Sequence, residues 1–254
     1  MSPACSDRRG LTAEAAHATV GGMTELTQEN WRRVDAYFTD TLVGHDEALE
    51  HAVAEQQAAG LPAIEVAPVA GKLLHLLARI SGARRVLEIG TLGGYSTIWL
   101  ARGIPADGLV TTVEAEPVNA AVARASIDRA GLGDKVEIRI GRGEDVLPTL
   151  AGPFDLVFID ADKESNALYL DWAARLGRPG TVVVVDNAGR AGEVADPGES
   201  SPQLDGVRRG LEVLGTDPRF DATALQTLDR KGWDGVAIAV LTDVVEGFDD
   251  AVEP

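Results

Sequence analysis

The sequence is short of cysteine, histidine, aromatic residues and positive charge. Cys5 is the only cysteine, so no disulfide can form within the chain, and the four histidines have no zinc-ligand spacing. Aromatic residues make up 5% of the chain, which predicts a core of valine, leucine, isoleucine and alanine. The 23 basic and 40 acidic residues give a net charge of −17. This charge disfavours a nucleic-acid or anionic-membrane partner, because phosphate contacts need clustered lysine and arginine.

Long apolar runs are also lacking. No run reaches the roughly 18 residues that a membrane-spanning helix requires, and the N-terminus has no leader pattern of charge followed by apolar residues. We therefore expect a cytoplasmic protein with no membrane partner. Residues 1–22 are small and polar, and we expect them to form a disordered N-terminal extension. Residues 23–254 have the length and apolar content of a single domain.

The chain begins with helical periodicity and then alternates between short apolar strands and helices. Helices are predicted within 24–59 and over about 68–82. Five strands follow, over 84–90, 109–115, 135–140, 154–161 and 181–188. The helices between them run to 10–14 residues in the longer cases, which predicts right-handed βαβ units and a parallel sheet covered on both faces.

The last part of the chain has a different pattern. Residues 189–203 are rich in glycine, proline, serine and acids, and we expect a mobile loop over the site. Two strand-like segments, RFDATALQTL and GVAIAVL, have no crossover helix between them, so they are predicted to pair antiparallel with a turn around Lys231–Asp234.

Two of the predicted strands end in oxygen-bearing side chains. FDLVFIDADK ends in Asp160, with Lys163 three residues later, and GTVVVVDNA ends in Asp186 and Asn187. Because the ends of parallel strands meet at one rim, these groups are expected to converge. Two carboxylates and an amide oxygen suit a hard cation such as Mg²⁺. Lys163 would lie beside that ion and be available as a base.

The turn after the first strand indicates a second ligand. Its glycines, from Gly90 on, follow G-x-x-G-G and not the G-x-G-x-x-G of a pyrophosphate-binding turn. Glu88 would repel a diphosphate but could accept a cationic group. Glu114 ends the second strand, where an acid accepts hydrogen bonds from ribose hydroxyls. These features suit S-adenosylmethionine, which is cationic and has no phosphate.

Five segments carry a family resemblance: VLEIGTLGGYS, VEAEP, FIDADK, VVVDNA and KGWDGVAIA. Over residues 24–242 the chain resembles the small bacterial form of the cation-dependent O-methyltransferases, which include catechol and caffeoyl-CoA O-methyltransferases. The resemblance implies a Rossmann-like class I methyltransferase fold, α/β, with a seven-stranded mostly parallel sheet, an antiparallel last strand and helices on both faces. It also implies a homodimer.

The same resemblance implies roles for individual residues. The metal ligands would be Asp160, Asp186 and Asn187, and the general base Lys163. Contacts to the methyl donor are implied for Val66, Glu88, Gly90, Thr91, Ser96, Glu114 and Gly143. One departure is Ser165-Asn166, where many relatives have Asn-Tyr. It leaves the metal and base positions intact but makes the acceptor specificity of relatives a poor guide.

The expected reaction is methyl transfer from S-adenosylmethionine to a hydroxyl of a small vicinal dihydroxy aromatic molecule, with a divalent cation as Lewis acid. A tRNA-modifying O-methyltransferase is the alternative; a local basic strip of Arg84, Arg85, Arg208 and Arg209 would favour it, whereas the acidic net charge opposes it. A non-catalytic binding protein ranks lower because the predicted site is complete. A nicotinamide dehydrogenase ranks last because the phosphate-binding glycine spacing is missing.

Overall fold

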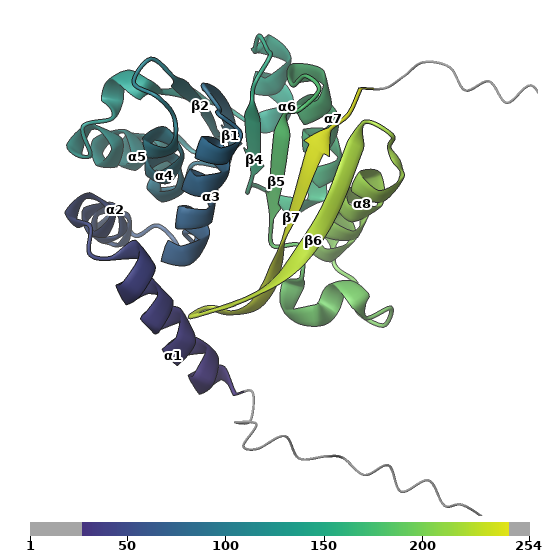
Figure 1. Cartoon of the computed structure of the whole chain (residues 1–254), viewed down its shortest axis with the longest axis horizontal. Helices are drawn as coiled ribbons and strands as arrows, with labels where there is room; N and C mark the ends of the chain where they lie inside the picture. The colour runs from purple at the N-terminus through teal and green to yellow at the C-terminus, as the bar shows by residue number, and fades with distance from the viewer. Residues whose placement is uncertain (1–26, 244–254) are drawn as a thin grey trace, which may run out of the picture.

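The computed structural model describes residues 27–243, which form one seven-stranded sheet with helices on both faces (Figure 1). The strands are Arg85–Ile89 (β1), Leu109–Glu114 (β2), Val136–Ile140 (β3), Leu156–Ile159 (β4), Val182–Asp186 (β5), Phe220–Asp229 (β6) and Gly232–Leu241 (β7). They lie in the order β3-β2-β1-β4-β5-β7-β6. The expected extension at residues 1–22 lies outside the described residues.

Eight α-helices and five shorter helical turns connect these strands within residues 27–243. The α-helices are Gln28–Phe38 (α1), Glu47–Ala58 (α2), Pro68–Ile80 (α3), Tyr95–Gly103 (α4), Pro117–Arg129 (α5), Gly143–Val146 (α6), Asn166–Leu176 (α7) and Pro202–Thr216 (α8). The turns are Thr39–Val43 (η1, a π-helical turn), Gly133–Lys135 (η2), Leu147–Thr149 (η3), Lys163–Ser165 (η4) and Arg190–Ala195 (η5). Three of the α-helices start with proline, which suits the first helical position because its missing N–H has no partner there. None of the helices in this part of the chain is long and apolar enough to cross a bilayer.

Strand pairing confirms the predicted fold class. The first five strands pair parallel, whereas β7 runs antiparallel to both β5 and β6. The chain leaves β1 toward β2 on one side and returns as β4 on the other, so the strand order reverses at the β1–β4 boundary. In open α/β sheets, the crevice at the carboxyl ends of such strands is where ligands bind.

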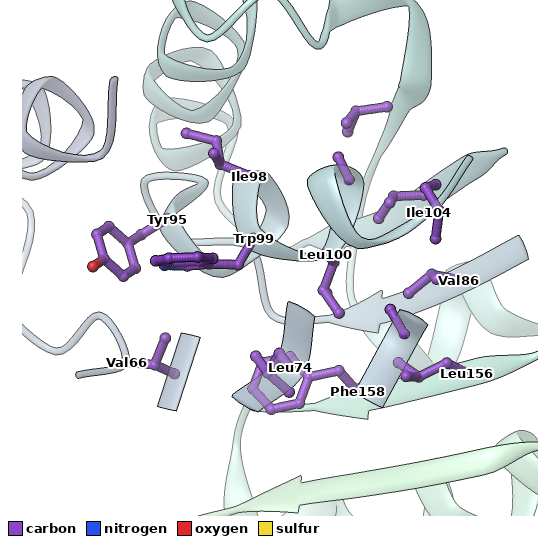
Figure 2. Packing of buried hydrophobic residues seen from close by; sticks show 14 of the residues in the cluster. Val66, Leu74, Val86, Tyr95, Ile98, Trp99, Leu100, Ile104, Leu156 and Phe158 are labelled. Atoms are coloured by element: carbon purple, nitrogen blue, oxygen red, sulfur yellow. The ribbon is translucent and has the colours of Figure 1, made fainter. Parts of the chain in front are cut away.

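Two apolar cores lie on opposite faces of the sheet because successive strand residues point to opposite sides. One core joins Val86 of β1 and Phe158 of β4 to Leu74 of α3 and to Trp99 and Leu100 of α4 (Figure 2). The other core contains the alternate strand residues together with side chains of α6, α7 and α8. The sheet is therefore covered on both faces, which holds its carboxyl-end rim rigid.

The C-terminal pair is the antiparallel hairpin that the sequence predicts, but the position of its turn was predicted wrongly. The turn consists of Arg230 and Lys231, between the end of β6 and the start of β7. Trp233 and Asp234 therefore belong to β7, paired with Leu228 and Thr227. Figure 1 shows the tip of this hairpin beside α1, where Arg32 Nε donates to the Arg230 carbonyl at 3.4 Å.

Gly90 permits the close approach of β1 and β4 at the rim. Its φ is +99°, and a Cβ added there would lie 2.1 Å from the backbone oxygen of Asp160.

We expect Gly90→Ala to lower the free energy of unfolding by about 3–5 kcal/mol, from backbone strain plus overpacking. Gly82→Ala is the matched control, since Gly82 has φ +64° but nothing within 4 Å of the added atom. It is expected to cost only the strain, about 1–2 kcal/mol. Urea unfolding of both variants measures the difference, and equal losses would contradict the close-contact argument.

Candidate active site

The carboxylate of Glu114 holds the glycine turn that follows β1. Its Oε2 accepts hydrogen bonds from the backbone N–H of Thr91 at 3.2 Å and of Leu92 at 2.7 Å. Its Oε1 accepts from the Glu116 backbone N–H at 3.0 Å and from Asn119 Nδ2 at 3.1 Å. Glu114 therefore joins the ends of β1 and β2, in addition to the ligand contact expected of it.

A cavity of about 770 Å³ opens at this rim. It collects most of the predicted site residues, namely Val66, Gly90, Thr91, Ser96, Glu114, Gly143, Asp160 and Lys163. Gly143 is needed as glycine, because a Cβ there would lie 2.5 Å from the ring of Tyr169 on the cavity wall. The sequence therefore identified side chains from many separate elements that share one cavity.

Glu88 lies beneath this cavity and is not among its lining residues. Its side chain is fully buried and accepts hydrogen bonds from three hydroxyls: Ser96 Oγ at 2.6 Å, Thr112 Oγ1 at 2.7 Å, and Thr97 Oγ1. Burial raises the pKa of Glu88 to about 7, although the three hydroxyl donors act in the opposite direction. In this structure Glu88 orients Ser96, which does line the cavity.

Lys163 and the carboxylates at the ends of β4 and β5 form a charged cluster. Lys163 is buried, and its Nζ donates to Asp160 Oδ1 at 2.7 Å. Asp186, the last residue of β5, has its pKa raised to about 7, first by burial and then by the nearby Asp160 carboxylate. Lys163 opposes that shift. The rim therefore holds more negative charge than one ammonium group balances.

Asp186 and Asn187 face a second cavity of about 340 Å³. Its wall is largely apolar and includes Leu73 of α3, Leu228 of β6 and Trp233 of β7. The two cavities adjoin, because Ile64 and Val66 line both of them. The first cavity, with its polar rim, and the second, apolar one thus meet beside the charged cluster.

Residues 62–66, which we call the dividing segment, separate the two cavities and are held from both sides. On one side, Gln56 Nε2 donates to the Pro62 carbonyl at 2.7 Å and to Glu65 Oε2 at 2.9 Å. On the other side, Lys231 Nζ donates to the Glu65 carbonyl, and Arg230 lies 3.9 Å from the Glu65 carboxylate. The hairpin tip therefore fixes the position of the wall between the cavities.

Sequence reasoning missed two partners of the site. Asp234 accepts the side-chain amide of Asn187 at 3.1 Å, but Asp-Gly in the sequence indicated only a turn. Tyr169 donates to the Asp162 carboxylate, and both side chains line the larger cavity. Asp162 and Tyr169 are seven residues apart, and whether their side chains meet depends on where α7 begins. Their spacing in the sequence is therefore a weak signal of this contact.

The segment 189–203, expected as a mobile loop over the site, contains η5 and is attached to α8. The Arg208 guanidinium donates to the backbone carbonyls of Glu193, Val194, Asp196 and Glu199. The residues that line the two cavities include none from this segment. It packs against Trp233, a lining residue of the smaller cavity, where a Cβ at Gly192 would lie 2.7 Å from the ring.

A cation would depend on a mixed set of ligands. Among residues 27–243 no three His, Cys, Asp or Glu side chains are grouped as a metal site. The predicted set has only two carboxylates, Asp160 and Asp186, with the amide of Asn187. Its chemistry fits a hard cation, because two carboxylates share a buried rim that raises the pKa of Asp186.

Comparisons with known proteins agree with this geometry. A model of the O-methyltransferase family matches residues 40–236. A catechol O-methyltransferase of Mycobacterium tuberculosis is 54% identical, over 84% of this chain and 97% of the relative. The solved O-methyltransferase of Bacillus cereus in complex with SAH is 49% identical, with a TM-score of 0.83 over 85% of this chain and all of that one. The O-methyltransferase from Streptomyces achromogenes involved in tomaymycin synthesis, solved with SAM, is 47% identical, with a TM-score of 0.82 over 87% and 100% of the two chains.

The sheet order and the cavity at its carboxyl-end rim are those of an enzyme with the class I methyltransferase fold. Within that class, the chain belongs to the O-methyltransferase family. The family predicted from the five sequence segments is thereby confirmed.

The raised pKa of Glu88 predicts a dependence of stability on pH. Between the ordinary glutamate value of 4.5 and about 7, the folded chain holds a proton that the unfolded chain has released. Stability is therefore lost as the pH rises through this window. Relative to wild type, Glu88→Gln is expected to gain about 2–4 kcal/mol in unfolding free energy between pH 4 and pH 8, because an amide does not ionise. Urea unfolding at several pH values measures this, and parallel curves for the two proteins would contradict it.

Proposed function

We propose that this enzyme transfers a methyl group from S-adenosylmethionine to a hydroxyl of a vicinal dihydroxy aromatic small molecule, and that the reaction needs a divalent cation. One observation carries the proposal: a large cavity with polar groups and a smaller apolar one adjoin beside Asp160, Lys163, Asp186 and Asn187. Two substrates can then meet next to a base and a cation site. The name of the Mycobacterium tuberculosis relative supports a catechol-like acceptor.

The larger cavity would hold the methyl donor. Solved relatives of similar sequence contain SAH or SAM, which supports S-adenosylmethionine here. Ser96 is oriented by Glu88 and would contact the amino-acid end of the donor. Glu114 would accept the ribose hydroxyls. Its oxygens already accept three backbone N–H groups and one side chain, so Asn119 is the contact that a ribose hydroxyl would replace.

Asp160, Asp186 and Asn187 would hold the divalent cation, most simply Mg²⁺, which prefers oxygen ligands. When bound, the cation supplies Lewis acidity, which lowers the pKa of a coordinated phenol. The excess of carboxylate over ammonium charge at the rim favours cation binding there. After burial, which is the larger cause, it also contributes to the raised pKa of Asp186.

Lys163 would act as the general base. It lies one turn beyond Asp160, and the 2.7 Å contact between them keeps its Nζ on the cavity wall. As a neutral amine, Lys163 would take the proton of the reacting hydroxyl. The resulting phenolate oxygen would attack the methyl carbon in line with the carbon–sulfur bond, which would break and release S-adenosylhomocysteine. The walls of the two cavities contribute by holding both reactants in this geometry, which replaces a bimolecular encounter.

The smaller cavity would take the aromatic ring of the acceptor. Its apolar walls, with Leu73, Leu228 and Trp233, suit a flat ring, while Asp186 and Asn187 lie at its polar end. An aromatic ring with hydroxyls at one end fits a cavity that has apolar walls and one polar end. A modified tRNA base fits it less well, because most of the basic strip that would favour RNA is bound to other groups of the chain.

Three of the four arginines of that strip have other partners. Arg84 pairs with Asp107, and Arg85 donates to the carbonyls of Ala151 and Pro153. Both lie at the start of β1, at the end opposite the site. Arg208 is committed to the segment 189–203. A nucleic-acid substrate is therefore not part of our proposal.

We further propose a cytoplasmic homodimer. The single cysteine supports a reducing compartment. Large apolar side chains are exposed on α1 and η1 (Tyr37, Phe38 and Leu42) and on β6 (Leu225 and Leu228). Such side chains near the hairpin tip suit a contact between two copies, and sedimentation velocity distinguishes one copy from two.

The first test is metal-dependent methyl transfer. The wild-type enzyme is expected to methylate catechol-containing small molecules and not a tRNA extract, and to lose activity in excess EDTA until Mg²⁺ is restored. Asp160→Ala is expected to abolish turnover, because it removes a metal ligand and the partner of Lys163. Mass spectrometry of the products provides the measurement. Full activity in EDTA would remove the cation from the reaction, and methylated tRNA would favour the alternative substrate.

The second test distinguishes proton removal by Lys163 from the effect of its positive charge. Lys163→Ala is expected to lower kcat by about 10²–10⁴, the usual effect of losing a positioned base, with partial recovery as the pH rises. Lys163→Arg keeps a cation beside Asp160, but a guanidinium does not give up its proton. Its kcat is therefore expected to fall by a similar factor. Wild-type kcat in Lys163→Arg would show that this position supplies only charge.

A further inference from the structure

The carboxylate of Asp234 has different partners on its two oxygens. Oδ1 accepts backbone N–H groups from Gly189 at 3.0 Å, Arg190 at 2.9 Å and Gly235 at 2.8 Å. Oδ2 accepts from Asn187 Nδ2 at 3.1 Å. One oxygen therefore binds the backbone that follows β5, and the other binds the side chain of a proposed metal ligand.

The contact with Asn187 decides which way its amide faces. A side-chain amide has a donor end and an acceptor end, whereas an ionised carboxylate only accepts. The nitrogen of Asn187 must therefore face Asp234, and its oxygen must point to the opposite side. Without such a partner, a half-turn of the amide exchanges oxygen and nitrogen with almost no change in shape. A cation needs the oxygen, because the amide nitrogen carries two hydrogens and is a donor.

We propose that Asp234 is a positioning residue of the cation site, which fixes the Asn187 amide with its oxygen available to the metal. The inference rests on the proposed function, since Asn187 needs a fixed orientation only if it binds a cation. Partners of this kind, which bind a metal ligand and not the metal, commonly change metal affinity by 10–100-fold.

The backbone around Asn187 shows why it also needs an anchor. Asn187, Arg190 and Ala191 all have positive φ, at 61°, 49° and 53°, which costs free energy for residues other than glycine. The contacts to Oδ1 and the hydrogen bond from Ala188 N to the Gly235 carbonyl at 2.8 Å stabilise this turn. A purely structural role for Asp234 would act through Oδ1 alone, and the positioning role acts through Oδ2.

Asp234→Asn separates the two roles. The oxygen of the new amide can keep the backbone contacts of Oδ1, while its nitrogen then faces Asn187. A donor in that place favours the turned amide of Asn187, with its oxygen toward position 234 and its nitrogen toward the cation. The anchor is thus kept while the orientation is reversed.

The double variant Asn187→Asp with Asp234→Asn is the rescue. The carboxylate at 187 presents an oxygen to each side, so it accepts from the new amide at 234 and still has an oxygen for the cation. The formal charge of the cluster is unchanged, because one carboxylate has moved from 234 to 187. Asp221→Asn is the matched control: it removes the same charge from an exposed position on β6, in the same hairpin.

The experiment measures Mn²⁺ binding by the electron paramagnetic resonance of free Mn²⁺, with thermal unfolding recorded in parallel. We expect Asp234→Asn to raise the Kd for Mn²⁺ by about 10–100-fold with little change in the Tm of the metal-free protein. The double variant is expected to return toward the wild-type Kd, and Asp221→Asn to match wild type. Recovery of affinity in the double variant supports the proposal even if Asp234→Asn also lowers Tm.

Two results would overturn the inference while leaving the proposed function intact. One is wild-type Mn²⁺ affinity in Asp234→Asn. The other is a loss of affinity that the double variant does not recover, which would assign Asp234 to anchoring alone. If the wild-type chain binds no Mn²⁺, the metal dependence itself fails, and the positioning role of Asp234 is overturned with it.

Discussion

Parallel pairing of β1, β2, β4 and β5 is the constraint on which the site depends, because it brings the carboxyl ends of four strands to one rim. The helices that cover both faces make this rim rigid. Gly90 lets the backbone after β1 pass against Asp160, and Glu114 ties that turn to the end of β2. The side chains of the site are thus positioned by backbone geometry before any ligand arrives.

Electrostatic imbalance is the second feature of the rim. Burial raises the pKa of Asp186, and the nearby carboxylates of Asp160 and Asp234 raise it further. Lys163 acts in the opposite direction. Such a cluster favours a compensating cation, which is the physical basis of the metal site that we propose. The acidic net charge of the chain does not indicate a further cation site, since most acidic residues among 27–243 are exposed and solvated.

Much of this arrangement could be predicted from the sequence because it depends on local patterns. Alternating apolar runs define the strands, and a polar residue at the end of a parallel strand must lie at the rim. The positions of Asp160, Asp186 and Asn187 at the rim could therefore be predicted without coordinates.

The contact of Asp234 with Asn187 could not be predicted in this way, because its partners after β5 are 44 to 47 residues earlier in the chain. Gly232 and the Asp-Gly pair also drew the predicted turn toward Lys231–Asp234. The partners of Glu88 come from β2 and α4, so only tertiary structure shows that three hydroxyls surround its carboxylate.

The wall shared by the two cavities constrains how this enzyme can acquire new acceptors during evolution. Ile64 and Val66 line both spaces, so a substitution in the dividing segment that reshapes one space also alters the other. Thr227, Leu228 and Trp233 line only the smaller cavity and come from the hairpin at the edge of the sheet. If the cavities are used as we propose, these three positions of the hairpin are therefore places where the acceptor range can change with the least effect on the donor cavity.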